Sequence, residues 1–344
     1  MTSLPPRSPE TVAAPRADNP LVTVIIPMRN EEAGIEACLD SVLANRLPNG
    51  GHWELLVLDG ESEDRSPAIV DAIAGRDPRV RRLANPKRLQ APAFNLGLAA
   101  ARGRYLVRMD AHSLYADDYL AECVRLLEET GAGSVGGVQR ATGTSWLSRA
   151  VAAAVSSKFA AGDAAYRNAT TPRWTDTVYL GAWRTETVRA LGGMREDWAV
   201  NEDYEMNVRL RATGAKIYLS PTIRSTYFVR SSLAKLARQY VRYGFWKVRT
   251  LLAHPASLRW RQLVAPAFVL SLVLTPLSVR LMGPLGAAHL AVYLVANLAA
   301  SAATASRAGW QYLPALPFIF FAVHCSWGSG FLAGCVVWPF RRHD

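Results

Sequence analysis

Carboxylates recur at three places where the chain leaves a segment of regular structure. Asp59 and Asp110 each follow an apolar run of strand character, and Glu202 and Asp203 lie in a dense acidic stretch. A single Asp after a strand often only caps the next helix, so one such residue decides nothing. Three carboxylate loops, together with a basic helix predicted at 231–252, favour one shared site for chemistry on a phosphate-bearing substrate.

Such a set of side chains suits group transfer from a nucleotide diphosphate donor. The departing diphosphate carries a heavy negative charge, which a divalent metal held by one or two carboxylates neutralises. A separate carboxylate must take the proton from the acceptor hydroxyl. Basic side chains help to hold the departing phosphates. The predicted helix at 231–252 carries five of them: Lys235, Arg238, Arg242, Lys247 and Arg249.

The elements that must position these groups alternate between strand and helix. Apolar, β-branched runs predict strands at 21–27, 53–58, 79–83, 104–109 and 134–138. Helical spacing predicts helices at 30–42, 66–74, 91–102, 117–129 and 202–213, with further strand-like segments at 215–219 and 222–227. We expect Asn30 to cap the first helix and Gly103 to end the third.

This alternation with short connections predicts an α/β fold with a doubly wound, mainly parallel sheet. Ligands bind such sheets outside the carboxyl ends of the strands, so Asp59 and Asp110 should share one site with residues 29–31. Neither GxGxxG after the first strand nor GxxxxGK[ST] is present, which argues against dinucleotide-binding and P-loop sites. Four cysteines without CxxC or His-rich spacing are expected to be isolated reduced thiols.

Charge and hydropathy are unevenly distributed along the 344 residues. The formal net charge is +11, and 34 of the 39 basic residues are arginine, which suits phosphates, an anionic membrane surface or nucleic acid. The sequence contains no nucleic-acid-binding motif, so we expect no nucleic-acid partner. Between Leu263 and Phe340 the only charged residues are Arg280 and Arg307. We therefore predict a basic soluble part followed by an apolar anchor.

The apolar part contains three candidate membrane segments, at 263–281, 285–304 and 312–338. About 20 helical residues cross a bilayer core of ~30 Å, so the first two segments qualify as spans. The third fits one tilted span or a re-entrant hairpin folded at Gly328–Gly330. Flanking arginines at 259, 261 and 307 indicate cytosolic loops, whereas those at 341 and 342 agree only with the hairpin. Residues 145–161 are mildly amphipathic and suit either a membrane surface or packing on the sheet.

Five motifs in order resemble glycosyltransferase family 2, whose members are inverting enzymes with the GT-A fold. They are VTVIIPMRNEE, VLDGESEDRS, RLQAPAFNLGLAAARGRYLVRMDAH, Asn201-Glu202-Asp203, and the QYVRY segment at 239–243, which is similar to Gln-x-x-Arg-Trp. Three further segments and the apolar tail are similar to the branch of the family that contains a glucosyltransferase of succinoglycan biosynthesis. The segments are DTVYLGAWR, NEDYEMNVRLR and RSSLAKLARQYVRYGFWK. The resemblance implies a nucleotide-diphospho-sugar transferase fold followed by transmembrane helices.

One departure from the family pattern bears directly on the metal site. The metal-binding Asp-x-Asp is replaced by Asp110-Ala111-His112. The resemblance still implies that Asp110 binds Mg²⁺ or Mn²⁺. His112 either coordinates the ion through a neutral ring nitrogen or only contacts phosphate.

The resemblance also implies a role for each remaining site residue. Asp203 would deprotonate the acceptor hydroxyl, with Glu202 beside it. Trp183 would stack on the acceptor sugar, although a core position fits it equally well, and Arg242 could instead contact the membrane surface. Nucleotide-sugar contacts are implied for Pro27, Glu31, Asp59 (through the uracil N3–H), Arg88, Asp110, Gln239, Arg242 and Tyr243.

Together these features predict a membrane-bound hexosyltransferase. It would move a sugar from a UDP-sugar to a lipid-linked saccharide in exopolysaccharide or cell-envelope glycan synthesis. UDP-glucose is the donor that we expect. Membrane lipids and other polysaccharide-assembly proteins are its expected partners. Because residues 1–20 lack an apolar core, we expect no signal peptide and a cytoplasmic catalytic domain on a multi-pass protein of the cell (inner or plasma) membrane.

The expected organisation is a disordered tail (1–20), a catalytic domain (21–230), a basic membrane-proximal helix (231–261) and a transmembrane region of two to four segments (262–340). Two alternatives remain open. A processive polysaccharide synthase would carry spans on both sides of the catalytic domain and a Trp where Tyr243 stands. A catalytically silent membrane scaffold could keep the fold, although Asp110 and Asp203 argue against it.

Overall fold

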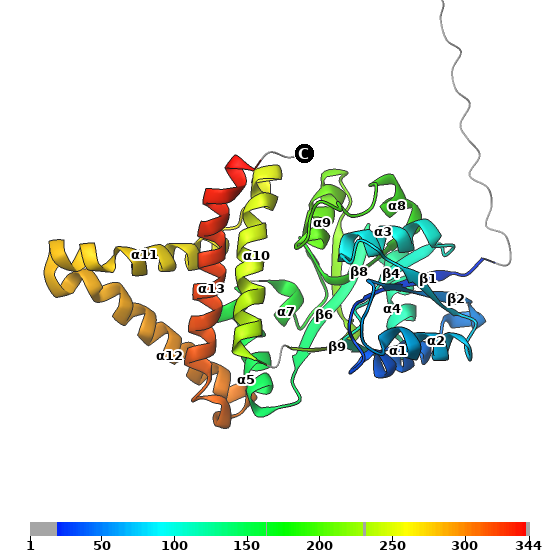
Figure 1. Ribbon diagram of the computed structural model, residues 1–344, viewed down its shortest axis with the longest axis horizontal. Coiled ribbons are helices and arrows are strands. Elements are labelled where there is room, and N and C mark those ends of the chain that lie inside the picture. Colours follow the sequence, from blue (N-terminus) through cyan, green and yellow to red (C-terminus); the bar gives the residue numbers. More distant parts are fainter. Residues whose placement is uncertain (1–18, 163, 230–231, 342–344) are drawn as a thin grey trace, which may run out of the picture.

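The computed structural model describes residues 19–162, 164–229 and 232–341, and Figure 1 shows a sheet domain joined to a group of long helices. Residues 1–18, most of the expected disordered tail, lie outside the described residues. The strands are β1 (Val22–Met28), β2 (Trp53–Asp59), β3 (Val80–Ala84), β4 (Tyr105–Arg108), β5 (Ser113–Tyr115), β6 (Ser134–Thr142), β7 (Arg173–Thr175), β8 (Tyr179–Arg184) and β9 (Ile217–Phe228).

The helices of the sheet domain are α1 (Ile35–Leu43), α2 (Ser66–Ala74), α3 (Gln90–Ala100), α4 (Tyr119–Thr130), α5 (Trp146–Val155), α6 (Lys158–Ala161), α7 (Ala165–Asn168), α8 (Thr185–Ala190) and α9 (Glu202–Ala212). The long helices that follow are α10 (Leu233–Ala253), α11 (Arg261–Met282), α12 (Ala288–Ala308) and α13 (Leu316–Val337). Short 3₁₀ turns are η1 (Pro48–Gly50), η2 (Pro255–Ser257), η3 (Gly283–Ala287), η4 (Trp310–Tyr312) and η5 (Trp338–Phe340).

The first half of the sheet is parallel and covered on both faces. The strand order among the described residues is β3-β2-β1-β4-β8-β6-β9-β5, with β7 paired to β9. β1 pairs in parallel with β2 and β4, and β2 pairs in parallel with β3. One apolar cluster packs α1, α2 and α4 on one face, and another packs α3, α8 and α9 on the other. The carboxyl ends of β1, β2 and β4 therefore lie at one edge, as predicted.

The second half makes the sheet mixed rather than mainly parallel. β8 runs antiparallel between β4 and β6, and β5 and β7 run antiparallel to β9. The sequence pattern did not predict β5, β7 or β8, because the first two have only three residues and β8 neither alternates nor forms a uniform apolar run. The two segments expected at 215–219 and 222–227 form one strand, β9, because a register shift at Gly136/Val138 of β6 accommodates the extra residues between them.

Two expected helix-end residues have other roles. Asn30 has a positive φ of 53° and its Oδ1 accepts a hydrogen bond from the backbone N–H of Glu63 at 2.8 Å, while α1 begins only after Gly34. Asn30 therefore joins two loops instead of capping the helix. α3 ends before Ala101, which is extended, and a Cβ on Gly103 would lie 2.4 Å from the backbone nitrogen of Thr23. Gly103 is required for close approach to β1, so its predicted role in ending the helix is wrong.

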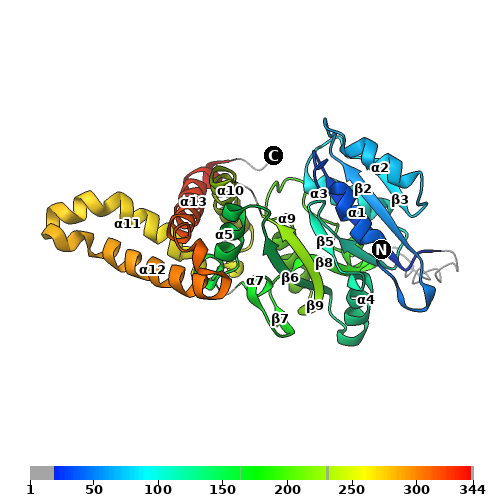
Figure 2. The ribbon, with the colours of Figure 1, turned by 90° about the horizontal axis from the view of Figure 1, so that it is seen from below.

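The carboxyl-terminal region consists of long apolar helices. Residues 261–308, which contain α11 and α12, and residues 316–340 are each long and apolar enough to cross a membrane. In Figure 1, α10 and α13 lie side by side, while α11 and α12 project away from the sheet domain. Figure 2 shows the same projection with α10 and α13 viewed nearly along their axes. α13 continues through Gly328 and Gly330 without a break, so the alternative of a hairpin folded at these glycines is wrong.

The amphipathic segment at 145–161 joins the two parts of the molecule. It forms α5 and α6, separated by a short break at Ser156–Ser157. The buried face of α5 packs with residues of α10, α12 and α13 in one apolar cluster, and α5 also contacts β6. α5 therefore lies between the sheet and the apolar helices.

Glycines bring the backbones of α10 and α13 into contact. A Cβ on Gly330 would lie 2.1 Å from the carbonyl oxygen of Val241, and one on Gly244 would lie 2.1 Å from that of Trp327. The neighbouring atoms belong to the backbone and cannot rotate away. The two helices can therefore pack this closely only while both positions are glycine.

Replacing Gly330 with Leu should destabilise the protein by about 1–3 kcal/mol or more, because the side chain forces the two backbones apart. Thermal unfolding of the full chain in detergent measures the effect. The matched control is Ala333→Leu, which introduces the same side chain at an exposed position of the same helix. Equal melting temperatures for the two variants would show that the close contact does not contribute to stability.

Candidate active site

A buried arginine brings two of the three predicted carboxylate groups, Asp110 and the Glu202–Asp203 pair, together at the edge of the sheet. Arg108 is the last residue of β4, and its side chain is only 8% exposed. Its Nη2 lies 3.5 Å from Asp110 Oδ1, and its Nη1 lies 3.8 Å from Glu202 Oε1 and 4.0 Å from Asp203 Oδ2. Asp110 and the Glu202–Asp203 pair, about ninety positions apart in the sequence, therefore share one cation.

Sequence reasoning missed Arg108, although the strand contains a signal for it. In the segment RYLVRM, Arg108 is a charge inside an otherwise apolar central strand. A charge buried there requires partners that neutralise it and accept its hydrogen bonds. The partners come from the loop after β4 and from the start of α9.

The two acidic residues at the start of α9 have different environments. The side chain of Glu202 is 7% exposed and that of Asp203 is 46% exposed. Burial first, and then the charge of Asp203, raise the pKa of Glu202 above its usual range, although Arg108 opposes the shift. Burial alone would lower the pKa of Arg108, but Asp110, Glu202 and Asp203 outweigh it and raise that pKa. Asp203 is thus the member of the pair that solvent and a substrate can reach.

Tyrosines fix the position of Asp110. The Tyr179 hydroxyl donates to Asp110 Oδ2 at 3.3 Å, and the backbone N–H of Asp110 donates to the Tyr115 hydroxyl at 2.6 Å. His112 points its Nδ1 toward Glu31 Oε1 at 3.3 Å, and the edge of its ring meets Tyr227 at 5.4 Å between centroids. Glu31 and His112, both predicted at the site, are therefore neighbours.

Asp110 and His112 are the predicted residues at this edge that could hold a divalent cation, through a carboxylate and an imidazole. Within residues 19–162, 164–229 and 232–341, no group of three or more His, Cys, Asp or Glu side chains has a metal-binding arrangement. Mg²⁺ usually takes only one or two protein carboxylates and completes its shell with substrate phosphates and water. The residues at this edge therefore fit an ion that arrives together with a diphosphate, and do not fit an ion held by the protein alone.

The side of the site that is predicted to bind the nucleotide base lies at the ends of β1 and β2. Pro27 pairs with Leu58, and Asp59 is the last residue of β2. Asp59 accepts a hydrogen bond from the backbone N–H of Ser62 at 3.1 Å, and its other oxygen lies 3.4 Å from Arg82. Its carboxylate is therefore fixed at the sheet edge.

Arg88 lies in the loop before α3 and forms an ion pair with Glu61, beside the end of β2. It has a positive φ of 57°. Lys87, next to it, pairs instead with Glu196 at 2.6 Å. The Arg88 guanidinium is half-exposed, so a phosphate could displace its acidic partner.

The motif on α10 contacts the loop that precedes the acidic pair. Gln239 Nε2 donates to the Tyr243 hydroxyl at 2.7 Å, and Asn201 Nδ2 donates to the backbone carbonyl of Tyr243 at 3.4 Å. Arg242 is exposed. Gln239 and Tyr243 therefore lie on the side of α10 that faces the sheet domain, whereas Arg242 is on the outside.

Trp183 is a core residue, and its predicted stacking on the acceptor does not fit the structure. It is 2% exposed, lies in β8 opposite Leu106 and packs its edge on Phe94 with ring centroids 5.8 Å apart. The apolar cluster of α3, α8 and α9 encloses the indole. The alternative of a core tryptophan is therefore the correct one.

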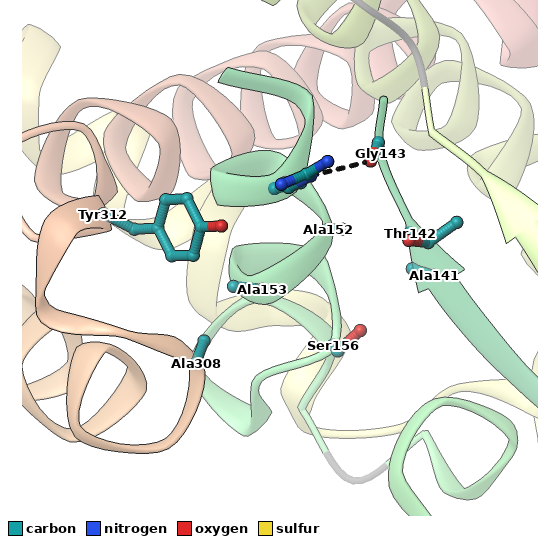
Figure 3. A pocket seen from close by; sticks show the side chains of 9 residues that line it. Ala141, Thr142, Gly143, Ala152, Ala153, Ser156, Ala308 and Tyr312 are labelled. Carbon is teal, nitrogen blue, oxygen red and sulfur yellow. Dashed lines mark hydrogen bonds between the residues drawn. The ribbon is translucent and has the colours of Figure 1, made fainter. Parts of the chain in front are cut away.

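A hollow of about 260 Å³ lies apart from the residues predicted for the active site (Figure 3). The end of β6, α5 and the end of α12 surround it, and small residues such as Ala152 and Ala308 line it. Arg149 donates from Nε to the carbonyl oxygen of Gly143 at 3.2 Å across one side. None of the residues proposed for the active site lines this hollow.

Comparison with known proteins supports one family. A model of glycosyl transferase family 2 matches residues 23–179. The succinoglycan biosynthesis protein ExoA of Rhizobium meliloti (strain 1021) is 34% identical over 246 residues, which cover 70% of this chain and 73% of ExoA.

A dolichyl N-acetyl-α-D-glucosaminyl phosphate 3-β-D-2,3-diacetamido-2,3-dideoxy-β-D-glucuronosyltransferase of Methanococcus voltae is 25% identical over 323 residues, or 92% of this chain and 97% of that protein. Among solved structures, the mannosyltransferase PcManGT of Pyrobaculum calidifontis, in complex with GDP-Man and Mn²⁺, aligns with a TM-score of 0.57 at 22% identity. The alignment covers 97% of this chain and 92% of that one. The fold is thus GT-A-like, and the chain belongs to glycosyltransferase family 2.

Proposed function

We propose that this glycosyltransferase moves a sugar from a UDP-sugar to a lipid-linked saccharide in one inverting displacement. Glucose is the sugar that we propose. The observation that carries the proposal is the shared contact of Arg108 with Asp110, Glu202 and Asp203. It joins a carboxylate suited to a metal–diphosphate complex with an exposed carboxylate suited to proton abstraction. Both are needed for transfer to a hydroxyl, and both lie at the carboxyl edge of the sheet.

Each side of the proposed site has its own task. Pro27, Glu31 and Asp59 would surround the nucleoside, and Arg88, Gln239 and Tyr243 would contact the diphosphate. Arg242, which is exposed on the other side of α10, would contact the membrane surface instead. Asp110 and His112 would hold Mg²⁺ or Mn²⁺, which neutralises charge on the leaving diphosphate when it is bound. Asp203 would accept the proton of the acceptor hydroxyl, and Arg108 would fix the positions of Asp203 and Asp110 relative to each other.

The apolar helices support a lipid-linked acceptor. The Methanococcus voltae relative is named for a dolichyl phosphate-linked substrate, and it matches nearly the whole of this chain. The ExoA relative is named for succinoglycan biosynthesis, which supports exopolysaccharide synthesis and contact with other polysaccharide-assembly proteins. We place the catalytic domain (21–230) at the cytoplasmic face and the basic helix (231–261) at the membrane surface. The membrane-crossing segments, two to four in number, would lie within residues 262–340.

A donor screen tests the proposal. The full chain in membranes is given UDP-glucose, other UDP-sugars and GDP-mannose with Mg²⁺, Mn²⁺ or EDTA, together with polyprenyl diphosphate-linked acceptors. We expect transfer with a UDP-sugar and loss of transfer in EDTA. Turnover with a GDP-sugar and with none of the UDP-sugars would overturn the donor assignment.

Replacing Asp59 with Asn should weaken UDP binding roughly 10- to 100-fold, since a hydrogen bond to a charged group contributes about 1.5–3 kcal/mol. Calorimetric titration of UDP and GDP measures the change, and GDP binding should hardly alter. The matched control is Asp71→Asn, because Asp71 pairs with the same Arg82 at 2.7 Å but is exposed on α2. An equal loss of UDP and GDP affinity would show that Asp59 does not contact the base.

A further inference from the structure

A small cavity of about 30 Å³ lies between the sheet and α10. By volume it holds about two water molecules, or one group of the size of a phosphate. Its lining comes from β6, α5, α7, β9, the segment after β9, and α10: Gln139, Val155, Arg167, Tyr227, Val229, Leu236, Gln239, Tyr240 and Tyr243. Carboxylates are missing from this described lining, which is unusual around an arginine.

Among the described residues, one lining side chain lacks a hydrogen-bond donor and another lacks a carboxylate partner. Gln139 is 8% exposed, and its Oε1 has no hydrogen-bond donor among the described residues. Arg167, which is half-buried, forms no ion pair with a described carboxylate. It hydrogen-bonds to the Tyr166 side chain, and Tyr240 and Tyr243 lie near it. A buried acceptor without a donor and a cation without an anion are both costly unless a ligand satisfies them.

The cavity shares Gln239 and Tyr243 with the proposed diphosphate site and extends from it on the side of the apolar helices. Tyr227 lines it and also contacts His112 at 5.4 Å and Tyr179 at 6.2 Å between ring centroids, and Tyr179 in turn bonds Asp110. The nucleoside side of the site, at Asp59, lies at the end of β2 in the other half of the sheet. In Figures 1 and 2, α7 lies between the sheet and α10, away from β2.

We propose that Arg167 and Gln139 form the binding site for a phosphate of the lipid-linked acceptor. The guanidinium of Arg167 would pair with the phosphate oxygens, and Gln139 Oε1 would accept a hydrogen bond from a hydroxyl of the same ligand. The cavity lies between α10 and the sheet edge that carries Asp110. From there a lipid tail could continue along the apolar helices while its sugar reaches Asp203. This inference rests on the proposed function and adds the residues that select a phosphate-bearing acceptor.

A binding measurement tests the site without relying on turnover. The full chain in detergent micelles is titrated with decaprenyl phosphate, decaprenol and UDP. The wild type should bind decaprenyl phosphate at least tenfold more tightly than decaprenol. Arg167→Gln should remove that preference and leave UDP affinity within twofold. Arg167→Lys, which keeps the charge, should retain part of the preference and covers the case in which the glutamine variant fails to fold.

The matched control is Arg173→Gln, which removes an exposed arginine from nearby β7 and should change none of the three affinities. An unaltered preference in both Arg167 variants would overturn the inference. So would a fall in UDP affinity, because Arg167 would then belong to the donor site. Failure of the proposed function appears separately, as absence of transfer in the donor screen despite selective binding of decaprenyl phosphate.

The arrangement of the long helices carries a second inference. α10 bears Lys235, Arg238 and Arg242 along its exposed side, and it is joined to the catalytic domain by the Asn201–Tyr243 and Arg249–Asp197 contacts. A helix with a row of exposed basic side chains that is also attached to the catalytic domain lies at a membrane surface and does not cross the bilayer. α13 packs along α10 with backbone contacts at Gly330 and Gly334, so it must share that orientation.

We infer that α11 and α12 make the membrane crossings and that α13 lies along α10 in the surface layer. Helices of 22 and 21 residues are about 33 and 32 Å long, which matches a bilayer core of ~30 Å. Both project away from the catalytic domain (Figures 1 and 2). Two crossings return the chain to its starting side, so Arg261, Arg307 and Arg341 all lie on the cytoplasmic face, as arginine-rich flanks do.

Cysteine labelling tests this topology. Cys325 and Cys335 are replaced by Ala, while Cys38 and Cys123 are buried and stay. Single cysteines at Leu258, Met282 and Phe340, which are all exposed, are then labelled with a membrane-impermeant maleimide in sealed vesicles of each orientation. Leu258→Cys and Phe340→Cys should react from one face and Met282→Cys from the other. Reaction of Phe340→Cys from the face of Met282→Cys, or of all three from one face, would overturn the inference.

Discussion

Replacing Asp203 with Asn should abolish sugar transfer while leaving UDP binding nearly intact. General base catalysis by a positioned carboxylate contributes about 10²–10⁴-fold to a rate, and an amide cannot take the proton. Asp203 is 46% exposed, whereas Glu202 beside it is buried, so Glu202 cannot replace it without moving α9. Initial rates of transfer from a UDP-sugar to a lipid-linked acceptor measure the loss, and titration of UDP checks binding.

The control for this variant is Glu186→Gln, which makes the same chemical change at an exposed position of α8. It should leave both the rate and UDP affinity unchanged. A rate for Asp203→Asn within a few-fold of the wild type would show that Asp203 is not the base. A large loss of UDP affinity would instead place Asp203 in the donor site.

Replacing Arg108 with Gln should cost about 3–5 kcal/mol of stability, because it leaves buried carboxylates without a cation. Asp110 and Glu202 are 13% and 7% exposed at the side chain, so water cannot take over the role of the guanidinium. Arg108 also lowers the pKa of Glu202, and its removal should therefore favour the protonated, neutral form of that residue. Transfer should fall together with stability, since Arg108 would fix the relative positions of the proposed metal ligand Asp110 and the proposed base Asp203.

Arg125→Gln is the matched control for Arg108. Arg125 also pairs with two carboxylates, Glu122 and Glu129, but it is largely exposed on α4. Exposed ion pairs contribute about 0–1 kcal/mol, so this variant should melt within a few degrees of the wild type and keep its activity. Equal melting temperatures for the two variants would refute the structural role assigned to Arg108.

The parallel half of the fold was predictable because its signals are local. The apolar runs of β1, β2 and β4 and the periodic spacing of α2, α4 and α9 lie within single elements. Asp59 and Asp110 follow two of these strands, so their position at the same edge of the sheet followed from sheet topology alone. The basic helix predicted at 231–252 corresponds to α10, which begins and ends within two residues of those bounds.

The rest depends on contacts between distant segments. The partners of Arg108 lie two and more than ninety positions away, and no local pattern indicates that the start of α9 returns to the end of β4. The antiparallel insertion of β8 is likewise set by its two neighbours in the sheet. The sequence allowed two interpretations of Trp183, and its burial in β8 against Phe94 identifies it as a core residue.

The stereochemistry of the product tests the central claim most directly. The full chain in lipid nanodiscs is given an α-configured UDP-sugar and a lipid-linked acceptor, and NMR determines the anomeric configuration of the new linkage. A single displacement assisted by Asp203 predicts a β-linkage. An α-linkage would contradict the account, because it requires two displacements or a different mechanism at the same edge of the sheet.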